Sequence, residues 1–411
     1  MSPEINSNQP ISRLPLEGKN VVLGVTGSIA AYKAADIASK LVQAGATVDV
    51  IMTTAATEFV GDSTFAALTH QPVTTGLWEA HSALSIDHVA LALSADCVLI
   101  APTTANTLAK LALGITDDPL TATVLATDAP VIVAPAMDAD MFASPTTRRN
   151  VKKLVDDGVT IAGPAEGRLA SGLVGNGRLV DTNTLVGLVR QAIGRNGDYA
   201  GRHVIVSAGG TKQPIDPVRF ISNRSTGKMG YAIAEAARDR GAEVTLVTAA
   251  DLPEPSGVTI VNVATVADMR DAILPISAES DLLIMAAAIS DFTPSDVADQ
   301  KIKKKGEGTI SLKLTKVEDF MPLAQGKNLV KVAFAAETSN LEANAQAKAI
   351  PKGAAFVVAN NVKEPDSGFG TDTNKVIFVD PDGNSEPQPL MNKLDVGHAI
   401  LDRALPHLSK G

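Results

Sequence analysis

Hydroxyl-bearing side chains follow three apolar runs in the first half of the chain. Gly27 and Ser28 follow the first run, Thr53 follows the second, and the segment PTTANT at 102–107 follows the third. If these runs are parallel strands, their carboxyl ends meet at one edge of a sheet, where ligands of such folds bind. N–H groups at a helix start favour a phosphate there. The Gly27-Ser28 pair could also form a tight turn without a ligand, since GVTGSIAAYK at 24–33 lacks the full GxGxxG pattern.

A histidine, an acidic segment and a glycine-rich stretch add further candidates. His88 follows Ser85, a typical N-cap residue, so we expect its imidazole in a first helical turn, where a neutral ring could meet an anion. A lone histidine can equally be structural. PAMDADMF at 135–142 contains Asp138, and GRLASGLVGNGR at 167–178 contains Ser171. The glycine-rich stretch could be a mobile lid or a plain loop.

The second half contains one long polar loop before an alanine-rich helix pattern. IDPVRFISNRSTGKMG at 215–230 brings together Arg219, Asn223 and Lys228. Such a group of donors near a helix start suits a phosphate or an acyl-phosphate. Downstream, AAAISDF at 286–292 ends an apolar run, and KIKKK at 301–305 follows. The lysine run by itself is typical of a solvated face.

The elements that must position these residues alternate between strand and helix patterns. This alternation predicts parallel sheets covered by helices on both faces. In the first half a helix pattern ends at Ala44, and strands are expected at 21–25, 47–52, 97–101 and 131–134. In the second half strands are expected at 204–207, 244–247, 282–286, 331–335 and 355–359.

The 411 residues suffice for two or three domains with cores of their own. We expect a disordered tail at 1–18, a first α/β domain at 19–190, a linker at 191–201 and a second α/β domain at 202–411. The tail prediction rests on its polar, proline-containing composition. The linker prediction rests on the polar segment RQAIGRNGDYAG, which lacks periodicity.

Composition excludes several classes of protein. No apolar run reaches the roughly 20 residues that span a bilayer, and the N-terminus lacks a secretory signal. The net charge of −9 disfavours a nucleic-acid binder, which needs a basic face. The single cysteine, Cys97, excludes an intrachain disulfide and a cysteine-based zinc site. These features favour a cytoplasmic enzyme, and no ligands for a metal can be assigned.

The motifs resemble those of a known family. GVTGSIAAYK, His88, PTTANT, PAMDADMF and the glycine-rich stretch are similar to flavin-dependent cysteine decarboxylases. With IDPVRFISNRSTGKMG, the most specific motif, residues 19–400 resemble the bifunctional phosphopantothenoylcysteine decarboxylase / phosphopantothenate–cysteine ligases of coenzyme A biosynthesis. The resemblance implies an N-terminal flavodoxin-like domain and a C-terminal domain with a Rossmann-like parallel sheet.

For the first domain the resemblance implies FMN-dependent decarboxylation of phosphopantothenoylcysteine. Oxidation of the substrate thiol creates an electron sink for loss of carbon dioxide, and the electrons later return, so the reaction is redox-neutral. The resemblance implies that His88 orients the departing carboxylate and that Asp138 binds the substrate. It assigns FMN to Gly27, Ser28, Thr53, Thr103, Thr104 and Asn106.

Two positions depart from the family pattern. Asp138 stands where the family has asparagine, and Ser171 stands where the family has the cysteine that gives the last proton. An asparagine can donate a hydrogen bond to a carboxylate, whereas an ionised aspartate cannot. Either another donor replaces the thiol, or this half stops at the enethiol.

For the second domain the resemblance implies ligation of phosphopantothenate to cysteine through an acyl-cytidylate made from CTP, with a magnesium ion (Mg2+) on the triphosphate. Asn223 would contact the acyl-cytidylate, and Arg219 and Lys228 would bind substrate. CTP would meet Met285, Ala286, Ala287, Asp291, Lys301, Glu318, Asp319, Phe320, Met321, Phe334, Lys348 and Lys352. The resemblance also implies a homo-oligomer, with trimer contacts in the first half and dimer contacts in the second, which together build a dodecamer.

Two other functions remain open. One is a nucleotide-sugar or NAD-dependent enzyme, although neither glycine turn shows GxGxxG with an acidic residue about 20 positions on. The other keeps an active ligase but makes the flavodoxin-like half a regulatory binding unit, as Asp138 and Ser171 would allow.

Overall fold

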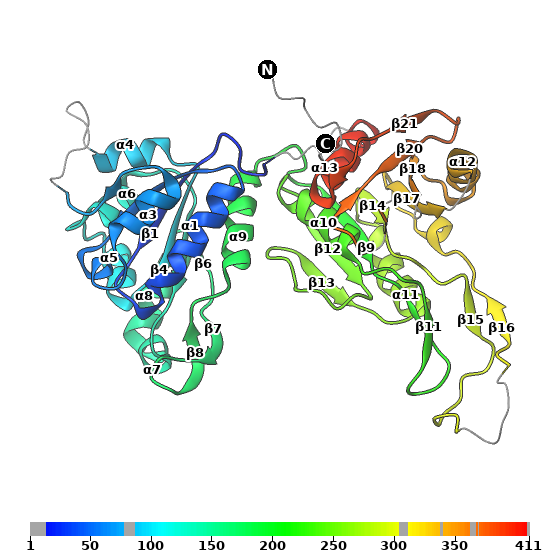
Figure 1. The fold of residues 1–411 in the computed structure, drawn as a ribbon, viewed down its shortest axis with the longest axis horizontal. Coiled ribbons are helices and arrows are strands. Elements are labelled where there is room, and N and C mark those ends of the chain that lie inside the picture. The colour runs from blue at the N-terminus through cyan, green and yellow to red at the C-terminus, as the bar shows by residue number, and fades with distance from the viewer. Residues whose placement is uncertain are drawn as a thin grey trace, which may run out of the picture. The chain divides into compact units, whose positions relative to one another are not determined.

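The structure, a computed structural model, describes residues 14–77, 87–303, 311–337, 340–361, 367–368 and 370–408, except the side chain of Asp87. The chain divides into two compact units, with the division between Ile193 and Gly194 (Figure 1). We call them the N-terminal unit and the C-terminal unit. None of the helices in these ranges is long and apolar enough to cross a membrane.

The N-terminal unit is built on a parallel sheet in the order β3-β2-β1-β4-β5-β6. Its strands are β1 (Asn20–Val25), β2 (Thr47–Met52), β3 (Val73–Thr74), β4 (Cys97–Thr103), β5 (Val131–Pro135) and β6 (Thr160–Ile161). A separate antiparallel hairpin joins β7 (Ala165–Arg168) to β8 (Val174–Arg178). The helices are η1 (Ile29–Tyr32), α1 (Lys33–Gln43), α2 (Thr54–Thr57), α3 (Asp62–Thr69), α4 (Asp87–Ser94), α5 (Ala105–Leu113), α6 (Pro119–Ala126), α7 (Ala139–Ala143), α8 (Pro145–Asp156) and α9 (Thr182–Gly194).

Apolar side chains on both faces of this sheet explain why helices cover both. Along β1, Val21 and Leu23 belong to a core with residues of α1, α3 and α9, whereas Val22 belongs to a second core with residues of α5, α6 and α8. This is the alternation expected of successive side chains in a strand. All of β4 is buried. The strand order reverses at β1, so its carboxyl end and that of β4 form the topological switch point.

The C-terminal unit is built on a sheet in the order β13-β12-β9-β14-β17-β18-β20-β21. Its strands are β9 (His203–Ala208), β12 (Glu243–Thr248), β13 (Thr259–Asn262), β14 (Leu282–Met285), β17 (Val330–Glu337), β18 (Phe356–Asn361), β20 (Val376–Val379) and β21 (Ser385–Pro387). Helices α10 (Lys228–Arg238) and α13 (Lys393–Ala404) share one core with the sheet, and α11 (Val266–Ser277) and α12 (Leu341–Lys352) share the other. The switch point lies between β9 and β14.

Two features of this unit differ from a fully parallel sheet. The last two strands, β20 and β21, are antiparallel, because no crossover helix separates them from each other. An arm also projects from the sheet (Figure 1). It contains the hairpin of β10 (Lys212–Pro214) and β11 (Phe220–Ser222) and the pair of β15 (Phe292–Pro294) and β16 (Leu314–Lys316). The remaining elements are β19 (Thr373–Asn374), β22 (Met391–Asn392), η2 (Met321–Leu323) and η3 (Leu405–His407).

The structure differs from the predicted tail at residues 14–18 and from the predicted linker at residues 191–201. Residues 14–18 form a turn in which Leu16 is buried and its N–H donates to Ala44 O over 2.8 Å; residues 1–13 lie outside the described residues. The predicted linker at 191–201 is partly built into the two units, because α9 continues to Gly194 and Tyr199 is fully buried in the C-terminal unit. The Tyr199 hydroxyl donates to Leu401 O over 2.7 Å. The polar composition of the segment concealed this anchor.

Candidate active sites at the carboxyl ends of the two sheets

Side chains after β1 tie together the strand ends of the N-terminal unit. Thr26 Oγ1 donates to Pro102 O over 2.7 Å and accepts from the Thr104 N–H over 3.0 Å. Ser28 Oγ donates to Ala136 O over 3.3 Å. The segments after β1, β4 and β5 are therefore adjacent, as the sequence predicts.

The turn after β1 holds two predicted FMN residues in a close contact with the segment after β2. A Cβ on Gly27 would lie 2.4 Å from Ala55 Cβ, so only glycine allows this approach. Ser28 is the N-cap of η1, and its Oγ accepts from the Ala30 N–H. The backbone of the turn can thus come close to a ligand at the switch point.

Three threonines at this edge use their hydroxyls in different ways. Thr53 Oγ1 is buried and has no hydrogen-bond partner within the described ranges. Thr103 Oγ1 is fully occupied, since it donates to Ile100 O over 2.6 Å and accepts from the Ala134 N–H over 3.2 Å. Thr104 caps α5, whose first turn exposes Asn106. The Thr103 side chain is 0% exposed, and its assignment to FMN stays a prediction.

His88 lies in the first turn of α4, as predicted, and is half-buried. The proposed N-cap, Ser85, lies outside the described residues. The role of the imidazole stays a prediction.

The glycine-rich stretch is an ordered hairpin, not a plain loop. Met137 N–H donates to Gly177 O over 3.0 Å, and a Cβ on Gly177 would lie 2.1 Å from Met137 O, so β8 packs directly on the segment after β5. At the hairpin tip, Ser171 Oγ donates to Asp138 Oδ2 over 2.7 Å. This hydrogen bond, with that from the Asp140 N–H, holds the pKa of the Asp138 carboxyl below its ordinary value. The two residues that depart from the family pattern are bonded to each other.

In the C-terminal unit, the loops after β9 and β14 are joined across the switch point. Ala288 N–H donates to Gly209 O over 2.9 Å, and Ser290 N–H donates to Thr211 Oγ1 over 3.0 Å. Asn223 Nδ2 donates to Ala288 O and Ile289 O over 3.3 and 3.1 Å. The predicted reacting residue Asn223 therefore lies beside the loop that begins with Met285, Ala286 and Ala287.

The two predicted substrate cations have partners within the unit. Arg219 Nε and Nη2 donate to Asp216 Oδ2 over 3.0 and 2.5 Å. Lys228, the first residue of α10, donates to Gly370 O and to Asp372 Oδ1 over 3.1 and 2.7 Å. Both side chains remain more than a third exposed.

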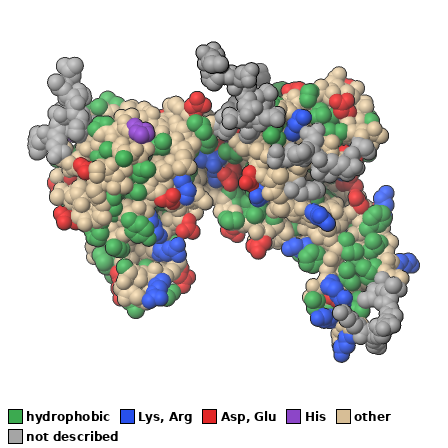
Figure 2. Space-filling view, viewed as in Figure 1, with side chains coloured by type: hydrophobic (Ala, Val, Ile, Leu, Met, Phe, Trp, Pro, Cys, Tyr) green, Lys and Arg blue, Asp and Glu red, His purple; other side chains and the backbone are tan. Residues whose placement is uncertain are grey.

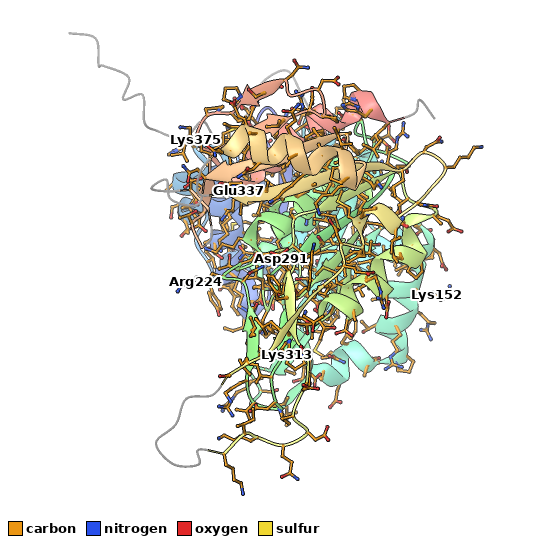
Figure 3. All side chains as sticks on the ribbon, turned by 90° about the vertical axis from the view of Figure 1, so that its right-hand side faces the viewer. Lys152, Arg224, Asp291, Lys313, Glu337 and Lys375 are labelled. Carbon is orange, nitrogen blue, oxygen red and sulfur yellow. The ribbon has the colours of Figure 1, made fainter. Side chains whose placement is uncertain are left out.

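The predicted CTP residues divide into accessible and buried side chains. Asp291, Lys301, Glu318 and Asp319 are exposed; Figure 3 shows Asp291 near the base of the arm and Lys313 farther along it. Phe320 and Met321 are 2% and 1% exposed within the core. The assignment of Phe320 and Met321 to the CTP site stays a prediction.

Three further predicted CTP residues lie on α12 and β17. Lys348 Nζ donates to Glu337 Oε1 over 2.6 Å, at the end of β17 (Figure 3). Lys352 pairs with Asp319. Phe334 is partly buried against the core. Lys348 and Lys352 lie four residues apart and so share one helix face.

Sequence reasoning missed two buried charged residues near this site. Asp216 accepts the hydrogen bonds of Arg219, and the Asp-to-Arg spacing of three within IDPVR was its only sequence signal. Lys393, 6% exposed, donates to Gly368 O and Thr371 O, and burial lowers its pKa to about 8. A lysine at a helix start gave no sign of this burial. Across the described ranges, no group of three His, Cys, Asp or Glu side chains could hold a metal ion.

Comparison with known proteins settles the family. The family model "DNA/pantothenate metabolism flavoprotein C-terminal domain" matches residues 199–407, and the model "Flavoprotein" matches residues 11–194. The coenzyme A biosynthesis bifunctional protein CoaBC of Bacillus subtilis (strain 168) is 44% identical over 392 residues, which cover 94% of this chain and 96% of that protein. The chain belongs to the family of bifunctional coenzyme A biosynthesis proteins.

The chain is also similar to other proteins. The CoaBC of Mycobacterium tuberculosis (strain ATCC 25618 / H37Rv) is 40% identical over 409 residues, covering 95% of this chain and 97% of that protein. A solved C-terminal domain of a CoaBC is 33% identical, with a TM-score of 0.43 over 51% of this chain and 97% of that domain. The solved FMN-dependent cysteine decarboxylase SpaF is 32% identical, with a TM-score of 0.37 over 42% of this chain and 98% of that protein. The family and the two-part α/β fold predicted from the sequence are confirmed.

Proposed function

We propose that the chain converts phosphopantothenate and cysteine to phosphopantetheine in two steps. The C-terminal unit would ligate the two substrates with CTP, and the N-terminal unit would decarboxylate the product with FMN. One observation carries this proposal: a nearly full-length match to bifunctional coenzyme A proteins falls on a chain with a separate switch-point site in each unit. We also propose that the protein is cytoplasmic and has no nucleic-acid or membrane partner; the net charge of −9 supports the lack of a nucleic-acid partner.

The N-terminal site fits a flavin phosphate and ring system. Thr53 Oγ1 is a buried polar atom without a partner in the described part of the chain, and Gly27 lets the turn after β1 pack closely against Ala55 beside it. We assign FMN binding to Gly27, Ser28, Thr53, Thr104 and Asn106. When bound, FMN would supply an electron acceptor for the substrate thiol.

The protein's own groups would bind and shield the substrate. His88 would contact the departing carboxylate as a hydrogen-bond donor. The hairpin β7–β8 packs on the segment after β5 and bonds to Asp138 through Ser171, so it can cover that side of the site and exclude water.

The C-terminal site fits carboxylate activation. A carboxylate oxygen of phosphopantothenate would attack the α-phosphorus of CTP and release pyrophosphate. The cysteine amine would then attack the acyl carbon, lose a proton and release CMP. Asn223 lies beside the strand-end loop and would contact the acyl-cytidylate, while Lys301, Lys348 and Lys352 would bind the triphosphate together with Mg2+.

We also propose that the protein is a homo-oligomer. The arm exposes a set of large apolar side chains together with lysine and arginine (Figure 2). These apolar residues are 43–58% exposed and comprise Val218, Phe220, Phe292, Val297, Leu312 and Leu314. A projecting apolar surface of this kind favours contact with a second copy. Sedimentation of the purified chain measures this directly.

A second candidate function retains only the ligase. It is favoured by Ser171 and Asp138, which are hydrogen-bonded to each other, because neither side chain has the thiol that gives the last proton in the family. Mass spectrometry of products from phosphopantothenate, cysteine, CTP and Mg2+ tests both. Phosphopantetheine as product supports the bifunctional proposal. Accumulated phosphopantothenoylcysteine supports the ligase-only function. If neither product forms, both functions are refuted.

A further inference from the structure

Asp216 divides its two carboxylate oxygens between two tasks. Oδ1 accepts from the Val218 and Arg219 N–H groups over 2.8 and 2.9 Å, which closes the turn between β10 and β11. Oδ2 accepts from Arg219 Nε and Nη2, and from the Ile302 N–H over 3.1 Å. The side chain of Asp216 is fully buried although Arg219 is 42% exposed. One carboxylate thus contacts two segments more than 80 residues apart in the sequence.

The contact with Ile302 is reinforced on both sides. Arg219 Nη2 donates to Ile302 O over 2.8 Å, so the same two side chains hold both backbone groups of Ile302. The Ala298 N–H also donates to Ile215 O over 3.0 Å. Lys301 and Lys303, which flank Ile302, are exposed. The lysine-bearing segment is therefore fixed to the turn that carries Arg219.

We propose that Asp216 is a positioning residue that couples the substrate loop at 215–228 to the phosphate-binding lysine segment at 301–303. The inference rests on the proposed ligase function, in which Arg219 and Asn223 serve phosphopantothenate and Lys301 serves CTP. Asp216 touches neither substrate. It fixes the Arg219 guanidinium and the Ile302 backbone relative to each other, so the two substrates meet in one geometry.

The strength of this coupling comes from charge. Hydrogen bonds between a carboxylate and a guanidinium are roughly twice as strong as neutral ones. The Arg219 guanidinium and three backbone N–H groups hold the pKa of the Asp216 carboxyl far below its ordinary value, so it is ionised throughout the working pH range. An asparagine in its place can keep one accepting oxygen for the turn but would direct an NH2 group at Arg219 and Ile302.

Two substitutions therefore separate positioning from structure. Asp216→Asn retains an acceptor for the turn and loses the link to Ile302. Asp216→Ala loses both. Asp299→Asn is the matched control, because Asp299 is exposed on the same segment and makes no hydrogen bond or ion pair with a described residue.

The test uses the full-length protein and two measurements. Ligase kinetics should show KM for CTP raised about tenfold or more in Asp216→Asn, on the scale of a lost charge-assisted bond, and unchanged in Asp299→Asn. Hydrogen exchange should be faster at Ile302 in Asp216→Asn, while the Val218 and Arg219 amides stay protected; Asp216→Ala should expose all three. Decarboxylation of added phosphopantothenoylcysteine should be unchanged in every variant.

Each outcome decides a separate point. Unchanged KM values with unchanged exchange at Ile302 would overturn the inference. Equal loss of protection in Asp216→Asn and Asp216→Ala would also overturn it, because Asp216 would then serve only the fold of the hairpin. A wild-type protein without ligase activity would refute the proposed function, whereas exchange at Ile302 would still report on the tether itself.

Discussion

Replacing Thr53 by valine should stabilise the flavin-free protein and weaken its binding of FMN. The substitution exchanges the hydroxyl for a methyl group of nearly the same size. Thr53 Oγ1 is buried without a hydrogen-bond partner in the described part of the chain. If FMN provides that partner, the hydroxyl has opposite effects on the two states.

The expected magnitudes follow from the cost of an unsatisfied polar group. A buried donor without a partner costs about 1–3 kcal/mol, and we expect valine to recover about 1 kcal/mol of this in the flavin-free state. In the complex, valine removes one hydrogen bond, worth about 1 kcal/mol. Together these shift the binding free energy by about 2 kcal/mol, which raises the Kd for FMN about thirtyfold.

Thr103→Val is the control. The Thr103 hydroxyl is also buried, but it already bonds to Ile100 O and to the Ala134 N–H. Its loss should destabilise the flavin-free and flavin-bound forms alike, by about 1–3 kcal/mol, and leave the Kd for FMN unchanged.

The Kd is measured by quenching of FMN fluorescence on titration with flavin-free protein. Stability is measured by calorimetry. Because the two units need not unfold together, the transition that shifts when FMN is added is assigned to the N-terminal unit. A Thr53→Val protein with wild-type Kd and no higher transition temperature would refute the assignment of Thr53 to the flavin site.

Three further predictions concern other polar residues of the two units. Asn223→Asp should leave the acyl-cytidylate poorly converted to amide, because a carboxylate cannot donate to Ala288 O and Ile289 O; mass spectrometry should detect the intermediate, and normal ligase turnover would contradict the role. Ser171→Ala should return the Asp138 pKa toward its ordinary value and release the hairpin tip. Because the pKa of Asp138 is lowered in the fold, the wild-type Ser171–Asp138 contact is present at neutral pH and is lost as the pH falls through that pKa. At neutral pH, tryptic cleavage after Arg168 or Arg178 should therefore be faster in the variant than in the wild type. The pKa of Lys393 is lowered to about 8 in the fold, so between about pH 8 and the ordinary value of 10.5 the unfolded chain binds more protons than the folded chain. Stability to urea should therefore increase with pH across that window. The Lys393→Met variant should lose this increase.

The sequence predicted β1, β2, β4 and β5 of the first sheet and β9, β12, β14, β17 and β18 of the second, because their apolar runs are buried within the sheets. The run at 97–101, for example, is the buried start of β4. It predicted the loops after these strands as ligand sites, since parallel strands end at one edge. It did not predict β3, β6, β13, β20 and β21, because short strands at or near a sheet edge carry little periodic signal.

The roles of individual side chains were harder to predict than their positions. Thr53 and Thr103 both follow strands, yet one hydroxyl is unpartnered and the other is satisfied inside the sheet. The difference depends on partners more than 30 residues away, such as Ala134. Phe320 and Met321 adjoin the exposed Asp319 but turn into the core. No local pattern contains that information.

The pairing of the proposed phosphate-binding cations has a physical consequence for the C-terminal site. Lys228, Lys348 and Lys352 each contact a carboxylate, from Asp372, Glu337 and Asp319 respectively. All three pairs are partly exposed, and exposed ion pairs contribute only about 0–1 kcal/mol, so the phosphate groups of the two substrates can displace these carboxylates at little cost. Asp216 is different, because its side chain is buried and its loss would leave Arg219 Nε and the Ile302 N–H without the acceptor that they have in the structure. The site therefore combines lysines that can exchange partners with one carboxylate that cannot, and the fixed partner is the one that sets the distance between the two substrate loops.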